Sequence, residues 1–376
     1  MQWRNAIAQH KVYLGMTYLN TQQPAESSMF KRNVKVKESN MKARIVGERQ
    51  SDVVPAPVPE PKEDWAVVKV HASAMCTEYK TWLAGDRREV IGHEGAGEVV
   101  AVAQPGRVKV GDRVTVMPQY PCGNCALCRS GDYIYCEDTY NFAEFTGSRD
   151  GSGTFAHYVV KPSWLLLPIP ERVTYEQATM AIDGIGASFG GMQAIGVGAF
   201  DTVLITGLGP VGLGGIINAR FRGARVLAVE PAPWRAALGL ELGAEVVLHP
   251  QDDPLARIRD LTGGRGVDCA VDCSGSVAGE RLCIDAVRRR GRVAFVGECS
   301  QELPIKVSPD LIRKGLLVSG NWLYNMQDYE GVMQVIAESP LIDKLISHVM
   351  PMSKIQEAFG LLAAGEAAKI VLHPWA

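Results

Sequence analysis

Long apolar runs are absent from this sequence of 376 residues. No stretch approaches the roughly 18 apolar residues that a membrane-spanning helix needs, and the N-terminus shows no apolar core of a secretory signal. An excess of charge of one sign is also absent, because 39 basic residues nearly balance 41 acidic ones. We therefore expect neither a membrane partner nor a nucleic-acid partner.

Cysteine is well represented, with nine residues. An odd number of cysteines in a long chain without a secretory signal argues for reduced thiols rather than disulfides. The length is sufficient for two domains, each with its own core. These features together predict a cytoplasmic protein of two domains.

The pattern of residues changes along the chain. Residues 1–40 are polar and aperiodic, so we expect a disordered extension or an over-long start, with a folded arm as the alternative. From 41 to 181 the pattern consists of short β-type runs separated by turn signals. From 182 to 324 strands alternate with helices, which predicts a parallel sheet. From 325 to 376 we expect two helices and a final strand over 369–372.

One proline-rich stretch, residues 55–61 with the sequence PAPVPEP, lies in the first of these regions. Proline cannot donate a hydrogen bond within a central strand. We therefore predict a loop over the whole stretch.

Four of the cysteines are concentrated in one loop. The pattern C-x-x-C-x-x-C-x7-C consists of Cys122, Cys125, Cys128 and Cys136. Four thiolates at about 2.3 Å complete the tetrahedral coordination of a zinc ion. A redox cluster or an iron–sulfur site is the alternative interpretation. The pattern favours structural zinc, which leaves no open coordination position and takes no part in chemistry.

A glycine-rich loop follows the predicted strand over 202–206 and precedes a predicted helix over 211–221. Its sequence GLGPVG consists of Gly207, Leu208, Gly209, Pro210, Val211 and Gly212. In a dinucleotide-binding loop the first glycine permits a tight turn, the second lets the pyrophosphate approach, and the third allows close helix packing. The helix N-terminus then faces the phosphates. This context predicts a dinucleotide site.

The acidic residue that such a site requires is Glu230, at the end of the next predicted strand. Its carboxylate can accept hydrogen bonds from both ribose hydroxyls and would repel a 2′-phosphate. Arg235 lies nearby and can offset part of that repulsion. The sequence therefore favours NAD over NADP as the cofactor.

The order of these motifs resembles the medium-chain dehydrogenase/reductase superfamily, and specifically its zinc-containing alcohol and polyol dehydrogenases. The resemblance is carried by residues 92–99 (GHEGAGEV), 111–114 (GDRV), the four-cysteine loop, 153–156 (GTFA) and the glycine-rich loop. It covers residues 41–376. It implies an α/β protein with a GroES-like β-rich catalytic domain over 41–181 and 325–376. A Rossmann cofactor domain with a doubly wound parallel sheet would span 182–324.

The resemblance also implies a second, catalytic zinc, whose first two ligands fall on Cys76 and His93. The third ligand falls on Asp183, whose alternative role is that of a helix cap. Such a set leaves one coordination position open for water or substrate. Glu94 would lie behind this metal or transiently join it, and Lys369 is the candidate for a contact with the pyrophosphate.

One position departs from the family pattern. The family commonly has serine or threonine two residues after the first zinc cysteine, whereas this sequence has Glu78. Glu78 could accept the substrate proton or bind a substrate hydroxyl. Thr77, Tyr79 or Thr81 could carry the proton instead, or Glu78 could be solvated while water removes the proton. The sequence leaves these alternatives open.

The expected function is the transfer of a hydride from an alcohol or polyol to NAD, and the reverse. A zinc-free quinone or enoyl reductase is one alternative, but it would lack the predicted zinc ligands. A zinc-binding interaction protein is a second, and it would need no NAD loop. A biosynthetic dehydrogenase of a cyclic polyol or amino-sugar alcohol is a third. The family forms homodimers and homotetramers, and residues 316–322 (LLVSGNW) are the candidate edge strand for such contacts.

Overall fold

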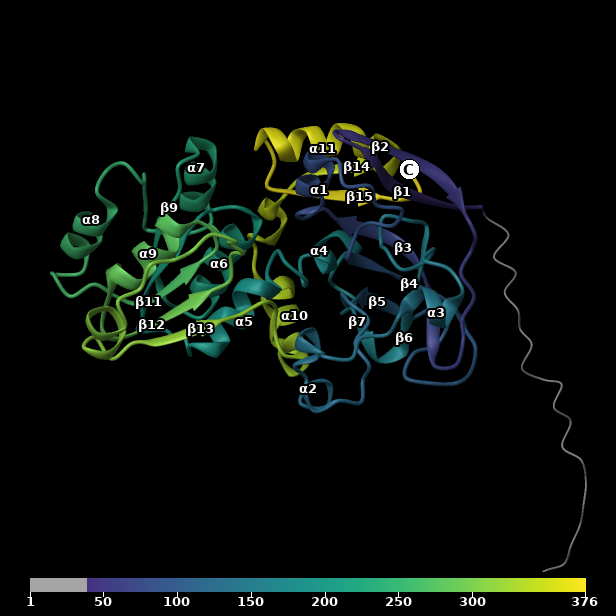
Figure 1. The fold of residues 1–376 in the computed structure, drawn as a ribbon, viewed down its shortest axis with the longest axis horizontal. Helices are drawn as coiled ribbons and strands as arrows, with labels where there is room; N and C mark the ends of the chain where they lie inside the picture. Colours follow the sequence, from purple (N-terminus) through teal and green to yellow (C-terminus); the bar gives the residue numbers. More distant parts are fainter. Residues whose placement is uncertain (1–38) are drawn as a thin grey trace, which may run out of the picture. The chain divides into compact units, whose positions relative to one another are not determined.

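The computed structural model describes residues 39–376, which form three β-sheets (Figure 1). The smallest is an antiparallel ribbon of β1 (Asn40–Gly47) and β2 (Gln50–Ala56). The loop predicted for residues 55–61 is wrong at its start, because β2 continues through Pro55 and Ala56. A two-stranded ribbon tolerates proline there, since it has no central strand whose ladder the missing N–H would interrupt.

A seven-stranded sheet has the order β14–β15–β3–β4–β5–β7, with β6 also paired to β3. Its strands are β3 (Trp65–Ala74), β4 (Glu94–Val102), β5 (Arg113–Val116), β6 (Tyr158–Pro162), β7 (Leu166–Pro168), β14 (Ile346–Pro351) and β15 (Lys369–His373). The last two strands come from the C-terminal end of the chain. The sheet therefore joins segments that are separated in sequence by the whole of the third sheet.

The third sheet is parallel throughout and has the order β10–β9–β8–β11–β12–β13. Its strands are β8 (Thr202–Thr206), β9 (Arg225–Val229), β10 (Val246–Leu248), β11 (Val267–Asp272), β12 (Val287–Phe295) and β13 (Leu317–Gly320). Val203 and Ile205 pack into one hydrophobic cluster, and Leu204 between them packs into another. A strand buried on both faces explains the continuous apolar run TVLI, as parallel sheets covered by helices require.

The helices that accompany these sheets are mostly short. They are α1 (Glu78–Ala84), α2 (Ala126–Arg129), α3 (Phe142–Thr146), α4 (Tyr175–Thr179), α5 (Gly186–Ala194), α6 (Pro210–Phe221), α7 (Pro233–Glu241), α8 (Pro254–Leu261), α9 (Val277–Ala286), α10 (Tyr329–Glu338) and α11 (Ile355–Ala364). Single turns are η1 (Tyr133–Tyr135), η2 (Ser163–Leu165), η3 (Val307–Ile312), η4 (Met326–Asp328), η5 (Ile342–Leu345) and η6 (Met352–Lys354). Within residues 39–376, no helix is long and apolar enough to span a bilayer.

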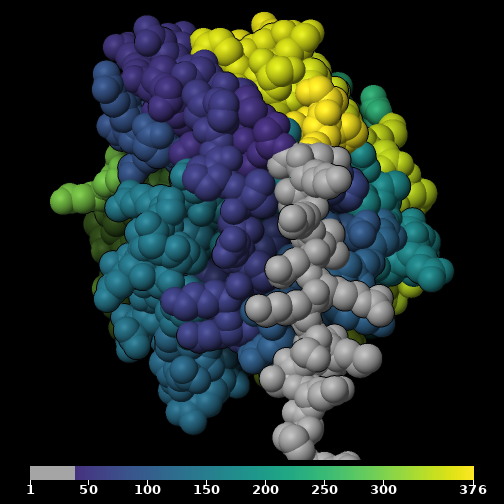
Figure 2. All heavy atoms as spheres, turned by 90° about the vertical axis from the view of Figure 1, so that its right-hand side faces the viewer, coloured from purple at the N-terminus to yellow at the C-terminus, as the bar shows by residue number. Residues whose placement is uncertain are grey.

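The two ends of the described chain lie side by side. Figure 2 shows the segment of β1 and β2 in purple beside the C-terminal segment in yellow. The side chain of Gln356, on α11, accepts a hydrogen bond from the Ser51 hydroxyl at 2.7 Å and donates one to the Arg49 carbonyl at 2.7 Å. These bonds attach the ribbon to the helix that precedes β15.

The predicted fold class is confirmed, because a β-rich part and a parallel α/β sheet are both present. The domain boundaries drawn after residues 181 and 324 stay predictions. The prediction for residues 1–40 lies outside the described residues, apart from Ser39 and Asn40, and Asn40 begins β1.

Candidate functional site

Cys76 and His93 are brought together by the pairing of β3 with β4. Ala74 at the end of β3 pairs with Glu94 at the start of β4, so Cys76 and His93 extend from the same edge of the sheet. Asp183 reaches them from the turn between α4 and α5. The ligand atoms of Cys76, His93, Glu94 and Asp183 all lie within 4.8 Å of one another. The structure thus gathers side chains that are as many as 107 positions apart in sequence.

Asp183 faces one nitrogen of the His93 ring. Its Oδ2 atom lies 3.0 Å from Nε2 of His93. Although burial raises the pKa of the Asp183 carboxyl, His93 lowers it well below its ordinary value. An ionised carboxylate, an imidazole nitrogen and a thiol at one point are the donors that zinc takes in a catalytic site.

Glu78 faces the other nitrogen of the same ring. Its Oε1 atom lies 2.8 Å from Nδ1 of His93, and its Oε2 atom accepts a hydrogen bond from the backbone N–H of Cys76 at 2.9 Å. Both carboxylate oxygens are therefore directed at predicted metal ligands. A carboxylate behind a histidine ligand fixes the orientation of the ring.

Glu94 and Lys369 form a buried ion pair behind this cluster. The exposed fractions of their side chains are 0% and 1%, and the Lys369 ammonium donates to Oε1 of Glu94. Burial raises the pKa of Glu94 to about 8, although Lys369 acts in the opposite direction. Oε2 of Glu94 has no hydrogen-bond partner among the described residues. A buried acceptor left without a donor is satisfied by a cation, so the cluster fits a bound metal.

Lys369 was predicted as a contact for the cofactor's pyrophosphate. The structure places its ammonium against Glu94 on β4, where burial is nearly complete. Sequence reasoning had connected neither Lys369 with Glu94 nor Glu78 with His93. The contact with the pyrophosphate stays a prediction.

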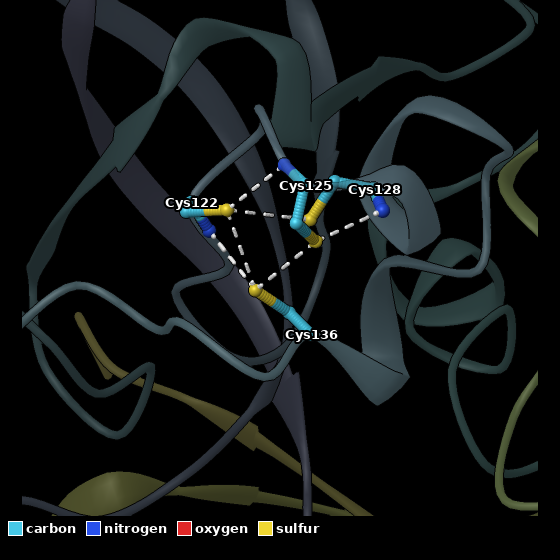
Figure 3. A group of neighbouring side chains, drawn as sticks. All are labelled: Cys122, Cys125, Cys128 and Cys136. Atoms are coloured by element: carbon cyan, nitrogen blue, oxygen red, sulfur yellow. Dashed lines mark hydrogen bonds between the residues drawn. The ribbon is translucent and has the colours of Figure 1, made fainter.

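The four cysteines of the second cluster face a common centre (Figure 3). Their Sγ atoms lie 3.6 Å apart for Cys122 and Cys136, 3.9 Å for Cys125 and Cys136, and 4.0 Å for Cys122 and Cys128. Tetrahedral bonds of about 2.3 Å place neighbouring sulfurs about 3.8 Å apart, so this set fits one zinc ion. Within residues 39–376 the cysteines are all free of disulfide bonds.

Backbone N–H groups surround the same sulfurs. Cys125 and Asn124 donate to the Cys122 sulfur at 3.3 and 3.4 Å, and Cys122 donates to the Cys136 sulfur at 3.3 Å. The backbone of the loop therefore holds both sulfurs in place by hydrogen bonds.

The glycine-rich loop has the geometry that the dinucleotide motif requires. Gly207 has a φ of 78°, which favours glycine. A Cβ atom at Gly212 would lie 1.9 Å from the Gly207 carbonyl oxygen, so the helix and the turn can pack together only without a side chain. A Cβ atom at Gly209 would meet no atom within 4 Å. The second glycine therefore faces open space, where a phosphate group can approach the backbone.

The N-terminus of α6 faces the same space. Gly209 is its N-cap without a side-chain hydrogen bond, and Pro210 and Val211 begin its first turn. Free N–H groups at a helix N-terminus are suited to an anion. The arrangement can hold a pyrophosphate.

Glu230 is attached to this loop by its carboxylate. Oε2 accepts a hydrogen bond from Leu208 N–H at 2.6 Å, and Oε1 accepts one from Ala232 N–H at 2.9 Å. The remaining lone pairs can accept from ribose hydroxyls. Arg235 lies on α7 just beyond, and its Nε has no hydrogen-bond partner among the described residues.

Two buried phenols near Asp183 were not indicated by the sequence. Burial raises the pKa values of Tyr133 and Tyr324, and the charge of Asp183 raises both further. Tyr133 lies between Cys128 and Cys136 in sequence, and the aromatic pair Tyr133 and Tyr135 in this loop was the available signal. Tyr324 follows β13, where no motif marks it.

Comparisons with known proteins identify the family. Residues 62–171 match the alcohol dehydrogenase GroES-like domain, and residues 210–338 match the zinc-binding dehydrogenase family. L-threonine 3-dehydrogenase of Pyrococcus furiosus is 32% identical over 336 residues, which cover 85% of this chain and 94% of the relative. Sorbitol dehydrogenase of Bombyx mori is 27% identical over 350 residues, covering 89% of this chain and 98% of the relative.

A solved structure leads to the same conclusion. An alcohol dehydrogenase from Thermus sp. ATN1 superposes with a TM-score of 0.81 at 26% identity, covering 89% of this chain and 99% of that one. The chain therefore belongs to the zinc-containing alcohol dehydrogenases of the medium-chain dehydrogenase/reductase superfamily, and it is a zinc-dependent oxidoreductase with a nicotinamide cofactor.

Proposed function

We propose that this enzyme oxidises a CH–OH group of an alcohol or polyol to a carbonyl group with NAD, and catalyses the reverse reaction. The observation that carries the proposal is the convergence of Cys76, His93 and Asp183 at one point. We further propose that these three side chains hold one zinc ion, while the four-cysteine loop holds a second. The distances between the cysteine sulfurs fit one tetrahedral zinc ion and so support a second zinc ion in this loop.

In the proposed reaction, zinc supplies a Lewis acid that polarises the substrate hydroxyl, and NAD supplies the hydride acceptor. The chain's own residues hold the reactants. Gly209 admits the pyrophosphate, and Glu230 binds the ribose. Cys76, His93 and Asp183 would hold the metal that binds the substrate hydroxyl within reach of the nicotinamide.

Glu78 acts in this proposal as a positioning residue for His93. Its Oε2 accepts a hydrogen bond from the N–H of Cys76, and its Oε1, which makes no hydrogen bond within the described residues, lies 2.8 Å from Nδ1 of His93. A proton acceptor needs a lone pair that faces the substrate. Thr77, next to Cys76, is an exposed residue whose hydroxyl is the alternative candidate to pass the proton to water.

The names of the relatives suggest which substrates to test. One is named for a hydroxy amino acid and another for a polyol. An NAD-reduction screen should therefore include L-threonine, sorbitol, simple secondary alcohols, cyclitols and amino-sugar alcohols. Turnover of at least one of these is expected, with two zinc ions per chain on the same sample, whereas one zinc ion and no NAD reduction would contradict the proposal.

Asp183→Ala tests the catalytic ligand set directly. It should remove one zinc ion per chain and nearly all turnover, because two ligands hold zinc poorly. NAD binding, measured by fluorescence or calorimetry, should persist. Retention of two zinc ions would remove Asp183 from the metal site.

We also propose a homodimer, or a tetramer of such dimers, joined through β13. This strand is the edge of the parallel sheet, and Leu317, Val318 and Trp322 on or next to it are 51%, 37% and 47% exposed. An exposed apolar edge strand favours pairing with a second copy. The free cysteines support a reducing, cytoplasmic location.

A further inference from the structure

The four-cysteine loop packs against the segment that leaves the parallel sheet. This crossover segment, residues 321–328, follows β13 and contains η4. The Asn325 side chain donates to the Ser130 carbonyl at 2.9 Å and to Oδ1 of Asp132 at 2.8 Å. A Cβ atom at Gly131 would lie only 2.2 Å from Oδ1 of Asn325, so the approach requires glycine there.

Backbone hydrogen bonds reinforce this contact. The N–H of Met326 donates to the Gly131 carbonyl at 2.9 Å, and the N–H of Trp322 donates to the Tyr135 hydroxyl at 2.9 Å. All of the partners in the loop lie between Cys128 and Cys136. The position of the crossover segment therefore depends on the part of the loop that the last two cysteines fix.

The other side of the crossover segment touches α5. A Cβ atom at Gly190 would lie 2.1 Å from the Leu323 carbonyl oxygen, and one at Gly186 would lie 2.4 Å from the Tyr324 ring. Gly186 begins α5, three positions after Asp183. Backbones in such close contact cannot shift independently, because packed interiors have no spare volume. The crossover segment thus limits where the Asp183 turn can lie.

Two buried tyrosines, one from the four-cysteine loop and one from the crossover segment, lie within the electrostatic influence of Asp183. Tyr133 comes from the four-cysteine loop and is 0% exposed, and Tyr324 comes from the crossover segment and is 2% exposed. Both phenols feel the charge of Asp183, which adds to the effect of burial in raising their pKa values. The contacts of Asn325 with the loop, and of Tyr324 with Gly186, therefore link the four-cysteine loop to the turn that carries Asp183.

We propose that the crossover segment is a positioning element that couples the two metal sites. When its cysteines hold zinc, the loop fixes Asn325 and Tyr324, and these fix Asp183 in the position it needs as a ligand. The four-cysteine site thus affects the reaction without touching substrate. The proposal rests on the proposed function, because it takes Asp183 as a ligand of the second zinc.

Asn325→Asp in the full-length, zinc-loaded protein is the main test. The substitution keeps the size of the side chain but removes its donor and places a carboxylate against Asp132. The matched control is Gln334→Glu, the same change on α10, where the amide donates to Glu338 at 3.4 Å. Zinc release into excess chelator is followed with a chromophoric indicator, and Asp183→Ala identifies the phase that belongs to the catalytic site.

The expected result is faster release from the catalytic site in Asn325→Asp, by about tenfold, as for other outer partners of metal ligands. The absorption bands of Co²⁺ placed in the catalytic site should also shift, because they report ligand geometry. Gln334→Glu should change neither. A lower melting temperature with unchanged release and unchanged Co²⁺ bands would show a merely structural role and overturn the proposal.

Tyr135→Phe is the second variant, should Asn325→Asp fail to fold. Tyr135 is 43% exposed, and the change removes only the oxygen that accepts from Trp322. It should also speed zinc release from the catalytic site and shift the Co²⁺ absorption bands, by a smaller factor than Asn325→Asp. Unchanged release and unchanged bands would overturn the coupling. Failure of the proposed function looks different: the wild type itself would then release one zinc ion per chain.

Discussion

Glu78 and His93 lie 2.8 Å apart, from carboxylate Oε1 to ring Nδ1, while the other ring nitrogen faces Asp183. Imidazole has two nitrogens, so an acid at one of them determines how the other is presented. This contact bears on the role of Glu78, which stands where the family commonly has serine or threonine. It supports the proposal that Glu78 positions His93, and the role of Glu78 as a proton acceptor stays the alternative.

Glu78→Gln should therefore weaken zinc binding at the catalytic site by about 10–100-fold, the usual effect of losing an outer carboxylate. Competition with a chelator of known affinity measures this. The control is Glu89→Gln, since Glu89 is an exposed acid whose contact with Lys42 is 3.6 Å long. Unchanged zinc affinity together with an altered pH profile of kcat would instead identify Glu78 as the proton acceptor.

Gly209→Ala and Gly212→Ala should affect different properties of the protein: the first should weaken NAD binding, and the second should lower stability. The methyl group at 209 meets open space, so the protein should keep its melting temperature but bind NAD poorly, because the methyl occupies the pyrophosphate's approach. The methyl at 212 would lie 1.9 Å from a carbonyl oxygen, and we expect a loss of stability of about 1–3 kcal/mol. Calorimetric NAD titration and thermal unfolding separate the two, and equal effects on both would contradict this assignment.

Glu230→Gln should reduce the preference for NAD over NADP. Hydrogen bonds to a charged group contribute about 1.5–3 kcal/mol, so kcat/KM for NAD should fall roughly ten- to a hundredfold. NADP should lose less, because the repulsion of its 2′-phosphate is removed. Glu245→Gln, at a surface pair with Arg225, is the control. An unchanged NAD to NADP ratio would show that Glu230 only anchors Leu208 and Ala232.

Leu317→Lys should dissociate the proposed dimer. A charge on an edge strand opposes pairing with a second copy. Light scattering coupled to gel filtration should give a single-chain mass for the variant and a multiple of it for the wild type. Val110→Lys, at another exposed apolar side chain away from β13, should leave the oligomer intact. A single-chain wild type would contradict the proposal.

Local pattern was sufficient for much of the fold. The strand over 202–206, the helix that starts beside Pro210 and the GLGPVG loop were predicted almost to the residue, because glycine, proline and β-branched residues restrict their own backbone. The loop predicted for the proline-rich stretch was partly wrong, because distant partners decide whether a strand is central or lies in a small ribbon. Pro55 in β2 shows this limit.

The sequence by itself indicated the four-cysteine loop and the glycine-rich loop, because cysteine spacing and a glycine turn are local properties. The ligands Cys76, His93 and Asp183 came only from the family resemblance. Only the tertiary structure decided how those residues work together. It set Glu78 against His93, Lys369 against Glu94, and Asn325 against the four-cysteine loop. Such pairs join side chains that chain spacing does not relate, and they arise when sheets and loops pack closely enough for buried charges to require partners.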